Sequence, residues 1–462
     1  MENNKSKDYS YRFLARVVLE AKTPISVGSG ENDIITDALV ATDVNGLPYI
    51  PGTTICGIIR HLIDGEHDKT KRKYTDSFFG FQYDSNEGHG SEIIFTEAKM
   101  IGADGKPVDG LQIIEWENDF YARYQKLPIR QHAKIDHKGV TVKFGKYDEQ
   151  VVFKGTRFCF EIEMVSDNVN DFNLFKEVLN QMSSETFRIG SGTRCGFGEI
   201  KIISCKTKQL NLFKPEDLNF YLNKSSLLTN DWQGNDYSVI DEPNTNWTTY
   251  ELTLRPEDFF LFGAGYGDEE VDMTPIKSSF VSWEGNIPTI VDDAILIPAT
   301  SIKGALAHRV AFHFNKLNGY YVGDDRAKVG NENIAVQELF GYENQLMKTQ
   351  KRGNVVFSDI IEKLDCQDKI LNHVSIDRFT GGSIDGALFS EKTIYGRGKD
   401  FSTKILVNKE AIQDDTIRQS FEESLIDICK GLLPLGGGVN RGNGCFLGEL
   451  KCDGTIIYPK KA

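Results

Sequence analysis

The beginning of the chain alternates polar and apolar residues as a half-buried β-strand does. Residues 12–20 read RFLARVVLE, and a second alternating run lies far downstream at 251–254. Successive side chains of a strand point to opposite faces of a sheet, so each run predicts a strand with one face against a core. The two runs are so far apart that they predict two units, each opening on a similar strand.

Each opening strand is followed by an amphipathic run, at 55–63 and at 302–314, which predicts a helix. Thr53 and Thr300 are the expected N-caps, because a hydroxyl there can accept from the first free amides. Further elements expected in the first unit are strands at 93–96 and 156–164, a helix at 172–182 and a last strand at 199–204. This order of strands and helices predicts an α+β fold of the ferredoxin-like type.

Five sequence landmarks recur in the same order in both halves of the chain. Asp37 and Asp272 each stand seven residues after the second glycine of a G-x-G turn. The paired segments are G-x-G at 28–30 and 263–265, I-P-x-T-x-I-x-G at 50–57 and 297–304, F-G at 79–80 and 340–341 with a strand after each, H-x-x-I-D at 132–136 and 373–377, and glycine-rich segments with an arginine starting at Gly190 and Gly436. Agreement in order, spacing and residue type indicates a duplication.

The duplication predicts two domains, at about 10–206 and 248–457. Residues 207–247 between them are rich in Asn, Asp and Ser and predict a polar linker with one short helix. Insertions at about 100–150 and 365–400 do not fit the minimal ferredoxin-like core. We expect both insertions to protrude.

A chain of 462 residues with 40% hydrophobic residues can bury two cores. Its eight cysteines never occur as C-x-x-C, which argues against a structural zinc site and fits reduced thiols. The beginning of the chain is polar, and no stretch approaches the length of a membrane span. The sequence therefore predicts a cytoplasmic protein without a membrane partner.

The net charge of −14 by itself argues against nucleic-acid binding, which depends on Lys and Arg. Residues 126–146 nevertheless carry six basic residues, Lys134 among them, against the single acid Asp136. This cluster is either a solvated charged loop or a local RNA-binding surface.

The glycine turns have two interpretations. Glycine tolerates positive φ, so each G-x-G can be a tight turn only. Small residues also let backbone amides approach a phosphate, and each unit combines an early G-x-G with a later glycine run and an arginine. Since neither unit has a nucleotide-triphosphate loop, we prefer a groove for a sugar-phosphate strand.

Asp37 and Asp272 are candidates for chemistry, although an aspartate after a turn commonly accepts backbone amides. Asp33 and Asp268 stand at matching positions, three residues after the glycine, and compete with them. His132 and His373 could act as acid or base, could stack on a base, or could pack a loop.

The motif order resembles the RAMP superfamily, the repeat-associated proteins of CRISPR systems, and within it the backbone subunit of type III effector complexes. The resemblance rests on G-x-G, the aspartate, GLPYIPGTTICG at 46–57, F-G, F-T-E at 95–97 and the late G-x-G-x-R-x-G-x-G. It covers nearly all of both units and omits the linker. Residues 46–57 and 271–276 carry it most specifically.

The resemblance implies a ferredoxin-like (RRM-like) palm with a protruding thumb in each unit, stacked along a guide RNA. It implies that Asp37 and Asp272 cut the target RNA with a divalent cation, Mg or Mn, and that guide RNA, target RNA and other effector subunits are the partners. It does not indicate which residues hold the metal. Together with the glycine and histidine interpretations above, it gives these expected RNA-binding residues: Gly28, Ser29, Gly30, Thr53, Thr54, His132, Lys134, Gly190, Gly192, Arg194, Gly263, Gly265, Thr300, Ser301, Lys303, His373, Gly436, Gly437, Gly438 and Arg441.

The two units depart from the pattern in different places. Val40 stands where the second unit has Pro275, and Ala299 replaces the glycine of the I-P-G-T turn. Either unit could therefore only bind RNA, and Asp272 is the stronger candidate. Two alternatives remain open: a non-catalytic guide-binding subunit, and a metal-independent guide-processing ribonuclease that uses His132 or His373.

Overall fold

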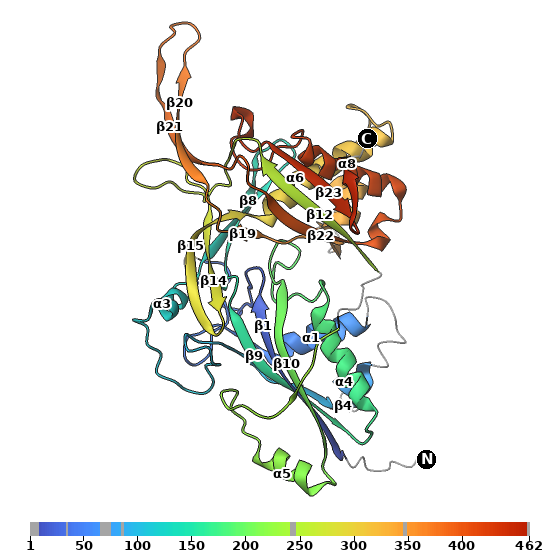
Figure 1. Cartoon of the computed structure of the whole chain (residues 1–462). Coiled ribbons are helices and arrows are strands. Elements are labelled where there is room, and N and C mark those ends of the chain that lie inside the picture. Colours follow the sequence, from blue (N-terminus) through green and yellow to red (C-terminus); the bar gives the residue numbers. More distant parts are fainter. Residues whose placement is uncertain are drawn as a thin grey trace.

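Two antiparallel sheets, one in each half of the chain, share a strand order (Figure 1). The computed structural model describes residues 9–33, 36–64, 75–84, 87–240, 246–344 and 349–459. The first sheet contains β1 (Tyr11–Ala21), β2 (Tyr49–Ile50), β5 (Ile93–Phe95), β6 (Ala98–Met100), β9 (Arg157–Ser166), β10 (Ile200–Asn211) and β11 (Asn235–Asp236). The second contains β12 (Trp247–Pro256), β18 (Val355–Val356), β22 (Phe401–Asn408), β23 (Phe446–Cys452) and β24 (Thr455–Tyr458).

The strand order identifies both halves as ferredoxin-like. It is β11-β10-β1-β9-β6-β2 in the first sheet, where β5 also pairs with β9, and β18-β22-β12-β23-β24 in the second. The fourth, first, third and second core strands lie side by side in each case, which is the ferredoxin-like arrangement. The predicted fold class is therefore confirmed. We call the halves the first and second unit.

Helices pack on each sheet and complete its core. The helices are α1 (Gly52–Asp64), α3 (Asp119–Gln125), α4 (Asp171–Asn180), α5 (Pro215–Asn223), α6 (Ala299–Leu317), α7 (Ile334–Phe340) and α8 (Asp415–Cys429), with 3₁₀ turns η1 (Gln181–Ser183), η2 (Gly330–Glu332), η3 (Lys409–Ile412) and η4 (Val439–Arg441). Phe13 of β1 and Phe175 of α4 are buried with ring centroids 6.2 Å apart, and Tyr250 of β12 lies 5.5 Å from Phe421 of α8. Each such ring contributes about 2 kcal/mol by burial. Among the described residues, no helix has the length and apolar composition needed to cross a membrane.

The expected N-caps are wrong in position. Helix α6 begins at Ala299 and α1 at Gly52, so Thr300 and Thr53 already lie inside the first turn. In α6 the carboxylate of Asp359 accepts from the backbone amide of Ala299 at 2.8 Å. An acid that is distant in sequence thus takes the role expected of the local hydroxyl.

The segment expected to be a linker is partly built into the first unit. Strand β10 continues through the predicted boundary at 206 to Asn211 and pairs with β11. Trp232 is buried beside Leu14 on the face of β1 opposite α1 and α4, and its indole donates to Glu161 at 2.7 Å. This segment therefore covers the second face of the first sheet.

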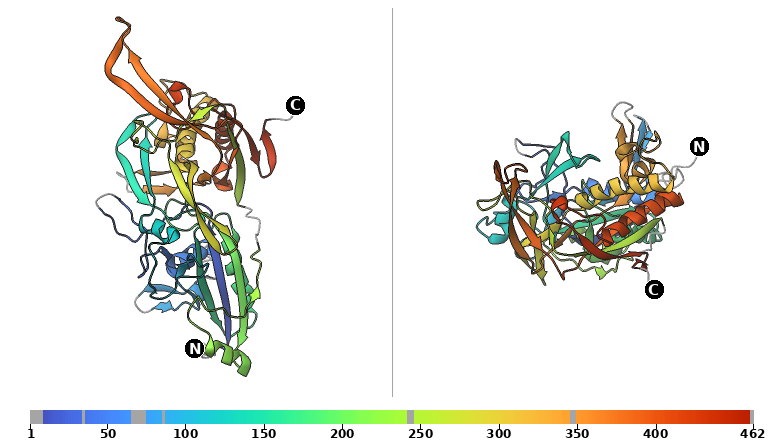
Figure 2. Two further views of the ribbon diagram at one scale, coloured as in Figure 1. Left: turned by 60° about the vertical axis from the view of Figure 1, so that its left-hand side comes forward. Right: turned by 90° about the horizontal axis from the view of Figure 1, so that it is seen from above.

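A pair of two-stranded hairpins carries the predicted protrusions. The first hairpin is β7 (Ile129–Ile135) with β8 (Thr141–Gln150), and the second is β20 (Gln367–Ile376) with β21 (Ser383–Tyr395), to which β13 (Phe259–Phe260) adds. The second hairpin projects freely, while the first lies alongside the second unit (Figures 1 and 2). Of the insertion expected at 100–150, the part before β7 packs on the core, where Val108, Phe120 and Tyr124 are buried.

The remaining strands are β3 (Phe81–Asp84), β4 (Glu87–His89), β14 (Lys277–Glu284), β15 (Ile287–Ile297), β16 (Gly341–Asn344), β17 (Thr349–Arg352) and β19 (Ile360–Glu362).

A polar junction joins the two units. The Arg188 guanidinium donates to the carbonyl oxygen of Phe357 at 3.0 Å and to the Ser358 hydroxyl at 2.9 Å, and that hydroxyl donates to Glu199 at 2.5 Å. Next to these contacts, the amide of Asp359 donates to the carbonyl oxygen of Gly196 at 3.1 Å. The contacts fix the late glycine segment of the first unit against the second unit.

The β14–β15 hairpin of the second unit extends back along the first sheet (Figure 1). Its Trp283 indole donates to the carbonyl oxygen of Gly155 at 2.7 Å, and the Arg157 guanidinium lies 4.2 Å from the centre of the Trp283 ring. The two units are thus in contact at two places, around Arg188 and around Trp283.

Candidate functional site

Asp37 and Asp272 lie in exposed loops that are tied to the base of a hairpin in the same way. The Oδ2 atom of Asp37 accepts from the backbone amide of Asp148 at 2.9 Å, and that of Asp272 accepts from the amide of Ser390 at 2.8 Å. The residue after each aspartate forms a parallel bridge with the residue after its donor. These bridges join Ala38 to Glu149 and Met273 to Glu391. The hairpin thus fixes the position of each carboxylate.

Each predicted histidine pairs with a glutamate on the opposite strand of its hairpin. His132 lies 3.0 Å from Glu149, and His373 lies 3.1 Å from Glu391. Each histidine ring also stacks on an aromatic residue that lies on the same strand as the glutamate. His132 stacks on Tyr147 with ring centroids 4.7 Å apart, and His373 stacks on Phe389 with ring centroids 4.8 Å apart. The residue whose backbone amide donates to the aspartate, Asp148 or Ser390, stands between this aromatic residue and the glutamate. Aspartate and histidine are therefore anchored to neighbouring residues of one strand.

Glu391 is the centre of the cluster in the second unit. It is fully buried and accepts from Arg441 at 2.5 Å and from Asn443 at 3.0 Å, in addition to its contact with His373. Burial by itself would raise the pKa of Glu391, but the hydrogen bonds from Arg441 and Asn443 outweigh it and hold the pKa below its ordinary value. Glu391 is therefore an anion that orients its neighbours.

The equivalent cluster of the first unit has a different set of partners. Glu149 accepts from the Ser191 hydroxyl at 3.1 Å, and the buried Arg130 on the facing strand lies 3.5 Å from Asp359 of the second unit. Desolvation lowers the pKa of the Arg130 guanidinium and raises the pKa of the Asp359 carboxyl. The cluster of the first unit thus extends into the junction.

The late glycine segments lie against the backbone segments that lead into the early glycine turns. The amide of Ser191 donates to the carbonyl oxygen of Ser26, and the amide of Gly437 donates to that of Leu261, both at 2.7 Å. A side chain at Gly190 or Gly436 would meet these same carbonyl oxygens. Both glycine groups therefore share one surface with the aspartate loop, and close backbone approach explains part of the glycine pattern.

Asp33 and Asp268, the internal competitors, act as turn residues. The Asp33 carboxylate accepts from the amide of Thr36 at 2.6 Å, and that of Asp268 accepts from the amide of Val271 at 2.9 Å. Lys392 bonds to Asp268 and, with the backbone amides, lowers the pKa of Asp268 to about 2. These contacts favour Asp37 and Asp272 as the residues left for chemistry.

Two predicted RNA-binding residues lie in the junction instead of on an open surface. Arg194 donates to the carbonyl oxygen of Gly353, and the Lys303 ammonium lies 3.5 Å from the Cys195 sulfur. The start of α6, with Thr300 and Ser301, is close to this region. By contrast, Thr53 at the start of α1 is exposed.

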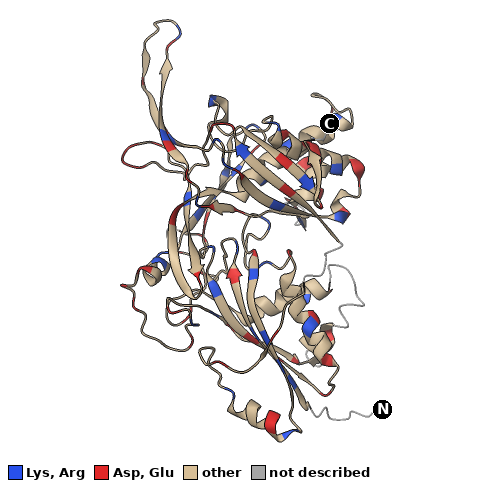
Figure 3. Ribbon diagram, viewed as in Figure 1, with Lys and Arg blue, Asp and Glu red and all other residues tan. Residues whose placement is uncertain are grey.

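The basic cluster predicted in the first unit lies on the first hairpin. Lys134, Lys138, Lys143 and Lys146 are all exposed there, whereas residues 370–376 of the second hairpin carry no charge (Figure 3). A positive surface can therefore attract phosphate along the first hairpin despite the net charge of −14.

The described residues contain no group of three or more His, Cys, Asp or Glu side chains placed to hold a metal ion. In the second unit, the Oδ2 atom of Asp272 already accepts from the amide and hydroxyl of Ser390. The described side chains therefore do not form a closed metal centre.

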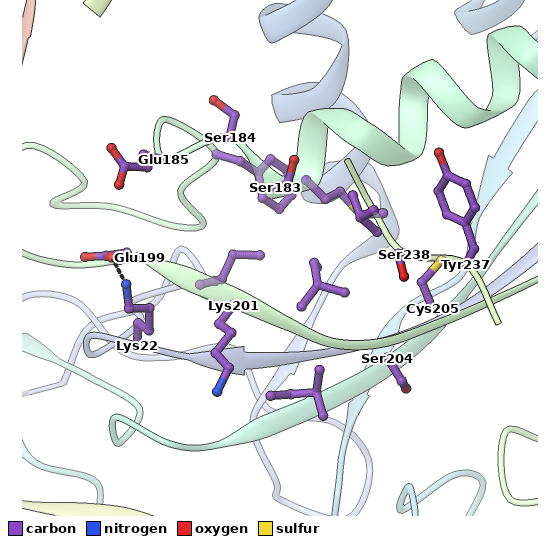
Figure 4. Close-up of a pocket in the computed structure, with 16 residues that line it drawn as sticks. Lys22, Ser183, Ser184, Glu185, Glu199, Lys201, Ser204, Cys205, Tyr237 and Ser238 are labelled. Carbon is purple, nitrogen blue, oxygen red and sulfur yellow. Dashed lines mark hydrogen bonds and ion pairs between the residues drawn. The ribbon is translucent and has the colours of Figure 1, made fainter. Parts of the chain in front are cut away.

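A pocket of about 450 Å³ lies in the first unit, and its lining includes no residue of either aspartate loop (Figure 4). It is lined by β10, by η1 and by 237–239, and Lys22 bonds to Glu199 at its edge at 2.6 Å. None of its lining residues was predicted to bind RNA or to take part in chemistry. The pocket is therefore separate from the candidate site.

Glu149 and Glu391 were not predicted from the sequence, because neither belongs to the five recurring landmarks. The second strands of the two hairpins read EQVVF from Glu149 and EKTIY from Glu391, a shared E-x-x-[VI]-[FY] pattern. This further repeated segment is the signal that could have identified both residues.

Comparisons with known proteins give two results. The RAMP superfamily model matches residues 18–201 and 278–446. A protein named CRISPR system Cms endoribonuclease Csm3 from Methanocaldococcus jannaschii is 28% identical over 201 residues, 41% of this chain and 75% of the relative. A protein of the same name from Methanothermobacter thermautotrophicus is 26% identical over 208 residues, 41% of this chain and 79% of the relative. Each alignment is about as long as one unit.

Proposed function

This chain belongs to the RAMP superfamily as a tandem of two units, and from that premise we propose that it is a backbone subunit of a type III CRISPR effector complex that cleaves target RNA. The observation that carries the proposal is the repeated attachment of an exposed aspartate to the base of a hairpin, beside a His–Glu pair. Two similar proteins are named endoribonucleases. Guide RNA would provide the sequence selection by base pairing.

The reaction requires little from the protein, because RNA carries its own nucleophile. The 2′-oxygen attacks the adjacent phosphorus, the bond from phosphorus to the 5′-oxygen breaks, and the products are a 2′,3′-cyclic phosphate and a 5′-hydroxyl. The proton leaves the 2′-hydroxyl, and one is gained by the 5′-oxygen. Asp37 and Asp272 would assist these transfers and hold the ribose and phosphate in line.

The His–Glu pairs would position the loop and the strand. His132 is stacked on Tyr147 and only 8% exposed at its side chain, so it has little access to RNA, while His373 is 26% exposed. This arrangement disfavours a processing nuclease that uses His132. It leaves the aspartates as the groups that face solvent.

A divalent cation, Mg or Mn, is part of the proposal. It would stabilise the negative charge that develops on the phosphate. Since the described side chains form no closed metal centre, RNA oxygens and water would complete its ligands.

The deciding experiment uses the assembled complex with a complementary RNA and compares Asp37→Ala, Asp272→Ala and the double substitution. We expect each single change to remove one distinct cut and the double change to remove both, with 5′-hydroxyl ends on every product. EDTA should stop cutting and added Mn or Mg should restore it. An unchanged set of cuts in the double variant would favour the non-catalytic guide-binding subunit, and EDTA-resistant cutting that needs the histidines would favour the processing nuclease.

A further inference from the structure

Three exposed apolar side chains gather at the loop that leads into β2, the edge strand of the first sheet. Val44, Leu111 and Ile113 are 81%, 85% and 98% exposed. The buried Asn45, which follows Val44, joins their two loops through two hydrogen bonds of 2.9 Å to the backbone of 110–112. Two loops that are distant in sequence thus present one apolar surface. We call Val44, Leu111 and Ile113 the apolar patch.

Contacts on both sides of 110–113 hold this loop in place. Before it, the Asp109 carboxylate accepts from the backbone amide of Leu228 at 2.8 Å. After it, Trp116 packs against the core of the first unit, and the side chain of Asn118 caps α3 (Figure 1). The fold therefore keeps Leu111 and Ile113 in water, where a group of apolar side chains is unfavourable unless a partner covers it.

Acidic residues flank the apolar patch. Segment 107–119 contains Asp109, Glu115, Glu117 and Asp119 but no lysine or arginine, and the last three of these acids are exposed. Such a rim repels the phosphates of RNA, whose binding depends on Lys and Arg. The charge is complementary to a protein segment that carries basic residues beside apolar ones.

The second unit has no counterpart of this loop. Residues 101–128 separate β6 from β7, whereas only 363–366 separate β19 from β20. The second unit does expose an apolar residue after α6, Val322, but acidic and basic residues are mixed in 324–328 beside it. Val322 therefore serves as a matched control position that is apolar and exposed but lacks an acidic rim.

We infer that the apolar patch and its acidic rim are a docking surface for another protein, through a segment with apolar side chains flanked by Lys or Arg. The apolar side chains supply the affinity, while the acids select the partner and speed its association. A second copy of this chain is disfavoured, because two molecules of net charge −14 repel each other. The inference goes beyond the proposed function and does not depend on cleavage by Asp37 or Asp272.

The first test places a photo-crosslinking amino acid at Ile113 of the full chain in the assembled complex and identifies the captured peptide by mass spectrometry. We expect crosslinks to a segment of a different protein in which apolar residues alternate with Lys or Arg. The same amino acid at Val322 should not capture that segment. Crosslinks to RNA, crosslinks to a second copy of this chain, or no crosslink to protein would each overturn the inference.

The second test measures binding of the captured segment, made as a fluorescent synthetic peptide, to the purified full chain. Ile113→Ser should weaken binding about tenfold, and Glu115→Lys combined with Glu117→Lys should weaken it about tenfold at low salt and remove most of its salt dependence. Val322→Ser should bind as the wild type does. Unchanged affinity in the Ile113 variant or in the charge-reversed variant would contradict the docking surface.

A further variant separates this inference from the proposed function. Asp37→Ala combined with Asp272→Ala should abolish cleavage and bind the peptide with wild-type affinity, whereas the charge-reversed variant should lose peptide binding and keep both aspartates. Loss of peptide binding in the double aspartate variant would show that the peptide binds at the aspartate loops, which would overturn the inference and leave the proposed function standing.

Discussion

Asp272 and Ser390 bind each other in both directions. The Oδ2 atom of Asp272 accepts from the amide of Ser390 at 2.8 Å and from its hydroxyl at 3.1 Å, while the amide of Asp272 donates to the carbonyl oxygen of Ser390 at 3.1 Å. In the first unit the same position is Asp148, whose amide bonds to Asp37 but whose side chain is a second carboxylate. The Asp272 carboxylate is therefore held more firmly than that of Asp37.

We predict that Ser390→Ala slows the Asp272 cut by about three- to tenfold, because one hydrogen bond to a charged group is lost while the amide bond remains. The reciprocal change Asp148→Ser supplies a hydroxyl and removes a like charge, so it should leave the Asp37 cut as fast or faster. Single-turnover rates of each cut in the assembled complex measure both effects. An unchanged Asp272 rate in Ser390→Ala would mean that the hydroxyl does not hold the carboxylate.

Removing the arginine that pairs with Glu391 should destabilise the second unit in a pH-dependent way. Arg441→Met leaves a fully buried carboxylate without its cation, which costs about 3 kcal/mol near pH 7. The pKa of Glu391 is lowered in the folded state, so the stabilisation is present above the ordinary value of 4.5 and is lost as pH falls through the lowered folded pKa. Urea unfolding should show the deficit of the variant shrinking below pH 4.5.

A matched control for this measurement is Arg418→Met. Arg418 pairs with Asp415 at 2.5 Å on the surface, with side-chain exposures of 48% and 84%. An exposed pair contributes at most about 1 kcal/mol, so the free energy of unfolding should change little at any pH. Equal losses in the two variants would contradict a special role for Glu391.

Local patterns were sufficient to predict the fold. The alternation in β1 and the amphipathic run of α1 depend on which residues face the core, and the repeat of G-x-G and aspartate located both loops. The contacts that the sequence could not predict are those between distant segments. The cap that Asp359 forms on α6 depends on how the second unit folds, and the bond from Arg194 to Gly353 depends on how the two units pack.

Only some residues of the candidate site were predicted from the sequence, for the same reason. Asp37 and Asp272 stood out because the repeat fixes their distance from a glycine turn, whereas Glu149 and Glu391 became visible only when the hairpin placed them opposite a histidine. The inequality of the two loops also depends on packing, since Gln131 reaches Gly265 across the junction.

The buried pair Arg130–Asp359 should show strong coupling across the junction. Arg130→Met leaves the Asp359 carboxylate buried without a cation and should lower the free energy of unfolding by about 3 kcal/mol. Adding Asp359→Asn removes that charge but keeps an oxygen that can accept from the amide of Ala299. The double variant should therefore be more stable than Arg130→Met, as measured by urea unfolding in a double-mutant cycle. Additive losses would show that the two side chains do not interact.

Gly196 and Gly442 provide the sharpest test of the junction, because they are equivalent in the repeat but only Gly196 is covered. Both have positive φ, +115° and +94°, so alanine at either position costs about 1 kcal/mol of backbone strain. At Gly196 the new side chain would also meet Asp359 and Ala299, and the backbone hydrogen bond between Gly196 and Asp359 would have to lengthen or break. Gly196→Ala should therefore loosen the junction and make 188–199 and 353–359 more susceptible to limited proteolysis, while Gly442→Ala keeps the wild-type pattern. Identical proteolysis of the two variants would mean that the junction tolerates the added methyl group and that the units are held together elsewhere.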